Sequence, residues 1–120
     1  ERLDSLIQIG LALPHGAEAA IRCWSSADPA VHAVQAEVDR QRFDILYESA
    51  LEVLGQERQA ELFADWAMYL LVGYEQVLLP QDSVAFTWIA GQLLDALDSG
   101  RFAAAPDADE TAASSSVTAR

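Results

Sequence analysis

Three acids spaced four residues apart are the side chains of this sequence that come nearest to an acid–base arrangement. Asp44, Glu48 and Glu52 share one face of a predicted helix, and carboxylates held close together can serve as general acids and bases. Glu37 and Arg40 extend the same polar face. A continuous polar face opposite the apolar residues is typical of the solvent side of an amphipathic helix. We therefore interpret these acids as a solvated stripe.

Histidine and cysteine are too sparse to predict a metal centre. A di-iron helical bundle needs Glu-x-x-His pairs, and neither His15 nor His32 has an acid three residues earlier. His15 follows Pro14, which should end a helix, so we expect His15 in a loop and His32 at the surface. The single Cys23 permits no internal disulfide, which indicates an intracellular, cytoplasmic protein, and we expect its side chain to be buried. No metal and no cofactor are expected.

Several enzyme classes are excluded by residues that the sequence lacks. All seven Lys and Arg residues are arginines, so no lysine is present for a phosphate-binding P-loop or a Schiff base. No Gly-x-Ser-x-Gly nucleophile elbow occurs either. We therefore expect no catalytic residues and no enzymatic activity.

Arg42 is unusual because it lies within a predicted apolar stripe, between Val38 and Ile45. In one interpretation it pairs with Asp39 one turn earlier and extends its guanidinium toward solvent. In the other it supplies a buried cation to a ligand or to a subunit contact. The sequence leaves both interpretations open.

Composition and charge restrict the partners of the chain. A chain of 120 residues that is 52% hydrophobic can bury one sizeable core and is most simply a single domain. A formal net charge of -12 repels phosphate, so we do not expect the chain itself to bind nucleic acid. No apolar run is long enough to cross a bilayer, and the N-terminal segment does not resemble a secretory signal, so no membrane partner is expected.

Apolar periodicity and capping signals predict an all-α fold, an antiparallel bundle of about five helices. Asp28 followed by Pro29 is a strong helix start, and Gly55 is a left-handed helix end. Residues 1–99 should form one helical domain. Its helices are predicted at 2–13, 17–25, 29–54, 57–79 and 84–98. Residues 100–120, rich in alanine, serine, threonine and acids, are predicted to be a disordered tail.

The last two predicted helices carry more apolar surface than one core needs. The helix at 57–79 has two apolar stripes covering more than half of its circumference, and the next helix places Val84 and Trp88 opposite its core stripe. Exposed apolar groups of this size are typical of an interface, and glycines allow helices to approach closely. Both helices could also be central within their own domain, but we favour a homodimer. Its predicted interface consists of Leu62, Trp66, Leu70, Gly73, Val77, Val84, Trp88 and Gly91.

Several short stretches form a pattern along residues 21–73. They are "IRCW" at 21–24, "DPAV" at 28–31, "VDRQR" at 38–42, Gly55, and the alanine-spaced run that ends in "YLLVG" at residue 73. Their order and separation resemble the C-terminal effector-binding and dimerisation domain of TetR/AcrR-type transcriptional regulators. The stretch "ERLDSLIQIGLAL" resembles the helix that precedes these elements in that family, so the resemblance covers about residues 1–98.

The resemblance implies a bundle whose last two helices pair with those of a second subunit as a four-helix bundle. It also implies a small hydrophobic or amphipathic effector among the middle helices, whose binding alters the contact of N-terminal helix-turn-helix domains with operator DNA, usually as a repressor. The same residues would also make an ordinary core. The implied cavity wall consists of Ile7, Leu11, Trp24, Phe43, Tyr47 and Trp66, with Met68 or Tyr69.

The family's helix-turn-helix segment has no counterpart before Glu1 in this sequence. Operator DNA would therefore be bound only through an N-terminal domain that the sequence lacks. The favoured function is the ligand-sensing and dimerisation domain of a regulator. A free-standing helical interaction module without ligand is the alternative, and an enzyme on a helical scaffold would require a catalytic role for Arg42.

Overall fold

The computed structural model describes residues 2–107, and within that range all regular structure is helical. The elements are α1 (Arg2–Leu11), α2 (His15–Ser25), α3 (Pro29–Leu54), α4 (Glu57–Gln76), α5 (Ser83–Asp98) and the 3-10 helix η1 (Arg101–Ala104). The prediction of an all-α fold with about five helices is confirmed. In the described part of the chain, no helix combines the length and the apolar character that crossing a membrane requires.

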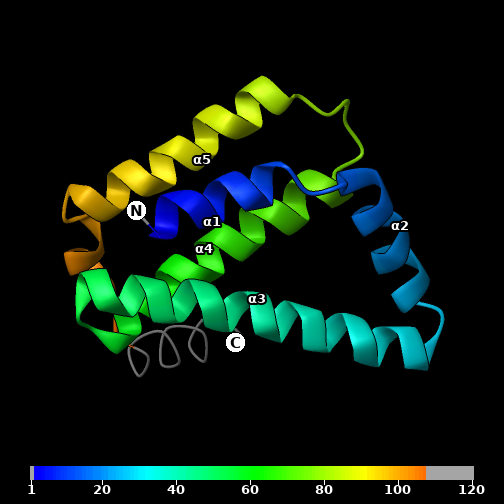
Figure 1. The fold of residues 1–120 in the computed structure, drawn as a ribbon, viewed down its shortest axis with the longest axis horizontal. Coiled ribbons are helices and arrows are strands. Elements are labelled where there is room, and N and C mark those ends of the chain that lie inside the picture. The colour runs from blue at the N-terminus through cyan, green and yellow to red at the C-terminus, as the bar shows by residue number, and fades with distance from the viewer. Residues whose placement is uncertain (1, 108–120) are drawn as a thin grey trace, which may run out of the picture.

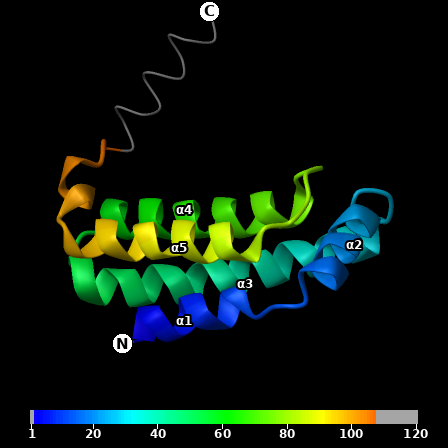
Figure 2. The ribbon, with the colours of Figure 1, turned by 90° about the horizontal axis from the view of Figure 1, so that it is seen from above.

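Four of these helices form an antiparallel bundle, shown in Figure 1 and from above in Figure 2. α1 and α4 lie on opposite sides of the bundle, and α3 and α5 lie between them, so that each helix contacts two neighbours of opposite direction. α2 does not run along the bundle. It crosses one end, where it packs against α3 and α4. The pairing of α4 and α5 with a second subunit stays a prediction.

Local capping chemistry fixes both ends of the long helix α3. The Asp28 carboxylate accepts hydrogen bonds from the backbone N–H groups of Ala30 and Val31, at 2.9 and 3.4 Å, and Pro29 occupies the first helical position. Gly55 ends the helix with a φ of 72°, a conformation that favours glycine. The chain therefore reverses within two residues, and α4 returns antiparallel to α3.

Three predicted helix boundaries are wrong by two or three residues. α1 ends at Leu11, two residues before the predicted end, and α2 begins two residues earlier than predicted, at His15. α4 ends at Gln76, and Val77 is already extended. Pro80 disfavours helical backbone only at Leu79, whereas α4 already ends where Val77 turns extended, with a ψ of 138°.

The buried core lies at the end of the bundle where α3 turns into α4. Ala50 of α3 and Ala60 of α4 are fully buried, and small side chains at both positions allow the two helices to approach closely. Phe63, Leu93 and Leu97 fill the space between α4 and α5. This end of the bundle is therefore closed by tight apolar packing.

The predicted disordered tail is wrong for its first residues. Gly100 turns the chain with a φ of 77°, and η1 then brings Phe102 back onto the core with only 5% of its surface exposed. The Phe102 ring centroid lies 5.8 Å from those of Phe63 and Trp66. One aromatic residue in a stretch of small and polar residues is a weak compositional signal, which is why the sequence does not reveal this turn. The rest of the predicted tail, 108–120, lies outside the described residues.

Replacing Phe102 tests whether this short helix belongs to the folded domain. Phe102→Ala should lower the free energy of unfolding by about 3 kcal/mol, because it removes a buried aromatic ring from the core. Val53→Thr, at an exposed apolar position on α3, should change it by less than about 0.5 kcal/mol. Urea denaturation of both variants makes the comparison, and equal stabilities would place Phe102 outside the core.

Candidate functional site

A cavity of about 200 Å³, partly open to solvent, lies between the four helices of the bundle. It is larger than the apolar cavity of roughly 150 Å³ that takes up benzene in an engineered protein. All four bundle helices contribute to its wall. The lining residues are Leu6, Ile7, Ile9, Gly10, Leu11 and Leu13 from α1 and its end, Arg42, Ile45 and Leu46 from α3, Ala67, Met68, Leu70 and Leu71 from α4, and Phe86, Ala90 and Leu93 from α5.

The cavity exists because three helices present very small residues to it. Gly10, Ala67 and Ala90 come from α1, α4 and α5. A Cβ atom added at Gly10 would meet no heavy atom of the described residues within 4 Å, apart from the helix's own backbone. Arg42 is the only charged side chain among the described lining residues. The site is therefore apolar with one cation in its wall, a combination typical of small-molecule pockets.

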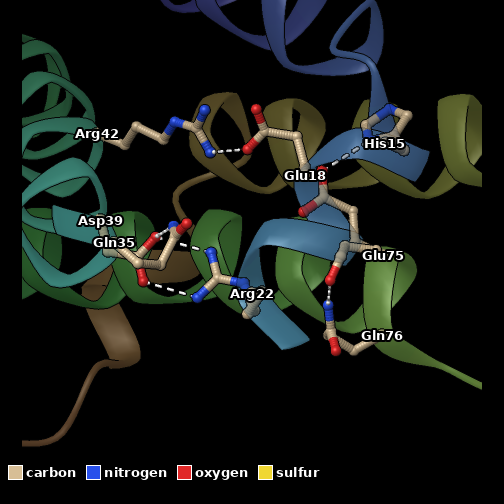
Figure 3. Close-up of polar contacts among 9 residues, drawn as sticks. His15, Glu18, Arg22, Gln35, Asp39, Arg42, Glu75 and Gln76 are labelled. Atoms are coloured by element: carbon tan, nitrogen blue, oxygen red, sulfur yellow. Dashed lines mark hydrogen bonds and ion pairs between the residues drawn. The ribbon is translucent and has the colours of Figure 1, made fainter. Parts of the chain in front are cut away.

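Beside the cavity, α2 turns polar residues toward the bundle. His15, Glu18 and Arg22 share one face of α2, and Figure 3 shows them directed at α3 and α4. The apolar residues Ile21 and Trp24 point outward, and Trp24 is 59% exposed. We call the set His15, Glu18 and Arg22 the polar face of α2. It replaces the apolar contact by which a helix normally joins a bundle.

Arg22 makes the most complete contact of this face. Its two terminal nitrogens donate to the two carboxylate oxygens of Asp39 on α3, each at 2.8 Å, and Gln35 adds a third donor at 3.1 Å. The hydrogen bonds from Arg22 lower the pKa of Asp39 below its ordinary value of 3.8, although partial burial opposes this shift. The same hydrogen bonds raise the pKa of Arg22.

The second contact joins Glu18 to Arg42. Nη1 of Arg42 donates to Oε1 of Glu18 at 2.9 Å, and both side chains are largely buried. Of the two interpretations left open for Arg42, the pairing with Asp39 is therefore wrong. The residue spacing along α3 would permit it, but α2 crosses α3 and provides each of these residues with a different partner.

The third contact joins His15 to α4. Nδ1 of His15 lies 2.7 Å from Oε2 of Glu75, and Nε2 lies 3.2 Å from the carbonyl oxygen of Leu11. The Glu75 side chain is fully buried, and the His15 ring meets Tyr74 and Phe86 edge-on. The expectation that His15 lies in a loop is wrong, because His15 is the first residue of α2 and inserts between α4 and α5. A lone histidine after a proline gives no sequence signal for a partner sixty residues later.

Only part of the predicted cavity wall lines the cavity. Ile7, Leu11 and Met68 do so. Trp24 does not, because α2 turns it to solvent, and Tyr69 is 71% exposed on the outer side of α4. Phe43 stacks on Tyr47 along α3, with ring centroids 6.1 Å apart. Trp66 lines a separate open groove with Phe102.

The predicted interface residues also divide into two groups. Leu62, Trp66 and Leu70 are half-buried against the core of their own chain. Val77, Val84 and Trp88 are exposed, the last by 66%, and Gly73 is exposed beside them along α4. Gly91 is half-buried on α5. Cys23, expected to be buried, is exposed on α2. An outer apolar surface therefore remains on α4 and α5, but it is narrower than the sequence pattern predicts.

Comparison with family models, with curated proteins and with solved structures finds no match to this chain. The resemblance to TetR/AcrR-type domains thus stays a prediction. In the part that the structure describes, no three histidine, cysteine or acidic side chains are grouped to hold a metal ion. The cavity and the adjoining polar face of α2 are the candidate site on which a function can be argued.

The Arg22–Asp39 contact predicts how stability changes with pH. Because the pKa of Asp39 is lower in the folded chain than in the unfolded chain, its contribution is complete above pH 3.8 and is lost as the pH falls through the folded value. Asp39→Asn should therefore lower the free energy of unfolding at pH 7 by about 2 kcal/mol, with a smaller loss at pH 3. Asp44→Asn, which disrupts an exposed pair with Arg40, is the control and should have little effect at either pH. A loss of equal size at both pH values would contradict this assignment.

Proposed function

We propose that this chain is the ligand-sensing and dimerisation domain of a regulator of the TetR/AcrR type. The observation that carries the proposal is the partly open apolar cavity between α1, α3, α4 and α5, with Arg42 in its wall. A small hydrophobic or amphipathic molecule fits this lining, because apolar surface leaves water and a single polar group orients the ligand. Operator DNA would be contacted by a domain outside this sequence.

The outer side of α4 and the start of α5 support the dimerisation part of the proposal. Gly73 lies on the outer side of α4, Val77 directly follows the end of that helix, and Val84 and Trp88 lie one turn apart on α5. The six-residue connection between the helices adds Leu78 and Leu79, which are also exposed. Large exposed apolar side chains of this kind favour contact with another protein surface. A second copy of the chain would cover them by pairing α4 and α5 with their counterparts.

A variant that fills the cavity tests ligand binding. Gly10→Leu places a side chain in space that the described residues leave open, and it replaces a glycine in the last turn of α1 by a residue of higher helix propensity. The thermal midpoint of the ligand-free protein should rise. Toluene, which should stabilise the wild type by about 2.7 kcal/mol at a concentration 100 times Kd, should no longer do so.

Gly16→Leu is the matched control for this experiment. Gly16 also has open space around it, but it lies on α2 and does not line the cavity. This variant should retain the toluene-induced rise measured by differential scanning fluorimetry. If toluene leaves the wild-type midpoint unchanged, the sensing function is wrong, and an interaction module without ligand becomes the better proposal.

Charged substitutions on the outer side of α4 and α5 test the dimer. Gly73→Arg and Trp88→Glu should convert a dimer into monomers in sedimentation velocity, because each places a charge in the apolar contact. Both positions are exposed within the chain, so the monomer should remain folded. Trp66→Glu is unsuitable, since Trp66 packs on Phe102. Val34→Glu, at an exposed position on α3, should leave the dimer intact, and a monomeric wild type would refute the proposed interface.

A further inference from the structure

Arg42 gives the otherwise apolar cavity a preference for ligands that carry a hydrogen-bond acceptor. A guanidinium has five N–H donors and no acceptor, so any ligand atom that pairs with it must be a hydrogen-bond acceptor. In the described part of the chain Arg42 donates one hydrogen bond, to Glu18. Its side chain is 25% exposed, and the guanidinium lies toward α2, as Figure 3 shows. Donors therefore remain for a ligand whose polar end lies at the α2 end of the cavity.

The charges around Arg42 are already balanced. Glu18 pairs with Arg42 and Asp39 pairs with Arg22, and Glu75 adds a third carboxylate beside His15. A protonated His15 would make the sum of these charges zero, and a neutral His15 would leave it at minus one. The formal net charge of the whole chain is -12. A carboxylate entering the cavity would thus meet no excess of positive charge, and its desolvation would go uncompensated.

We infer that the cavity selects a neutral apolar molecule with a hydrogen-bond acceptor, such as a medium-chain ketone or ester, and that Glu18 sets this preference by neutralising Arg42. The inference rests on the proposed sensing function and names the class of ligand for the same site. Arg42 donates to the acceptor oxygen, and the apolar chain fills the space left by Gly10, Ala67 and Ala90. Glu18 is a specificity-determining residue that acts through Arg42.

Three probes of similar length separate the possible head groups at pH 7. These are 2-octanone, octanoate and octylammonium, with toluene as a purely apolar reference. For the wild type, isothermal titration calorimetry should give a Kd for 2-octanone at least about tenfold lower than for either ion. Octylammonium cannot accept the hydrogen bond from Arg42, which can supply a tenfold difference, and octanoate loses affinity because the desolvation of its carboxylate is uncompensated.

Two variants assign the roles of the pair. Glu18→Gln leaves Arg42 with an unbalanced charge, so octanoate should bind about tenfold more tightly than in the wild type, while 2-octanone changes by less than about threefold. Glu18→Gln with Arg42→Met removes the donor without leaving a carboxylate unpaired, and the affinity for 2-octanone should fall about tenfold. Arg40→Met with Asp44→Asn removes an exposed pair of the same charges on α3 and should leave every affinity unchanged.

Each result either supports or overturns the inference. Two results would overturn the role of Glu18. One is a wild type that binds octanoate more tightly than 2-octanone. The other is a Glu18→Gln variant in which the ratio of the affinities for octanoate and 2-octanone is unchanged. If toluene binds but 2-octanone is not preferred over the ions, the sensing function stands and the inference fails. If no probe binds the wild type, both fail. If the double variant does not fold, the affinity ratio measured on Glu18→Gln alone still decides the role of Glu18.

Discussion

The attachment of α2 through a polar face determines the shape of this bundle. At the Gly55 end, Ala50 and Ala60 allow α3 and α4 to pack closely. At the other end the two helices diverge, and α2 crosses between them (Figure 1). Helices that diverge from a closed end leave an interior too wide for ordinary side chains to fill, above all where glycine and alanine face it. The cavity adjoins the core, since Leu93 belongs to both, and it reaches toward α2, whose Glu18 pairs with the lining residue Arg42.

Hydrogen-bonded charges hold α2 differently from the way that apolar packing would. The bonds of Arg22 to Asp39 and of His15 to Glu75 are directional, so they fix both the register and the rotation of α2 on its neighbours. Two buried polar atoms of these contacts, Oε1 of Glu75 and Nε of Arg22, have no hydrogen-bond partner within residues 2–107. Unpaired buried polar atoms reduce the net gain from such contacts. The core at the Gly55 end is mainly apolar, and the fully buried polar side chain there, Ser49, donates to the carbonyl oxygen of Ile45 at 2.8 Å, so little of its burial is offset in this way.

Local signals predicted the elements well, and tertiary contacts explain what they missed. Asp28, Pro29 and Gly55 fix helix ends through hydrogen bonds and backbone angles within a few residues, so the sequence reveals them directly. The orientation of α2 could not be predicted in this way. Apolar residues are normally buried, so Trp24 was expected inside. Its polar neighbours Glu18 and Arg22 face the bundle instead, because their partners lie on α3. Ile7 and Met68 were expected in the cavity wall from the family resemblance alone, and both residues do line it.

The apolar character of α4 around most of its circumference now has a physical account. Ala67, Met68 and Leu71 face inward and line the cavity, whereas Tyr69 and Gly73 lie on the outer side of the same two turns. A helix turns 100° per residue, so successive residues of this part of α4 face the cavity and the outer side in turn. When both of these faces are apolar, the same turns have no polar stripe. The second apolar stripe therefore does not require α4 to be buried on all sides. It requires only that the wall of the cavity and the exposed surface of α4 be two faces of one helix, so a ligand that moves the inner face would also move the outer one.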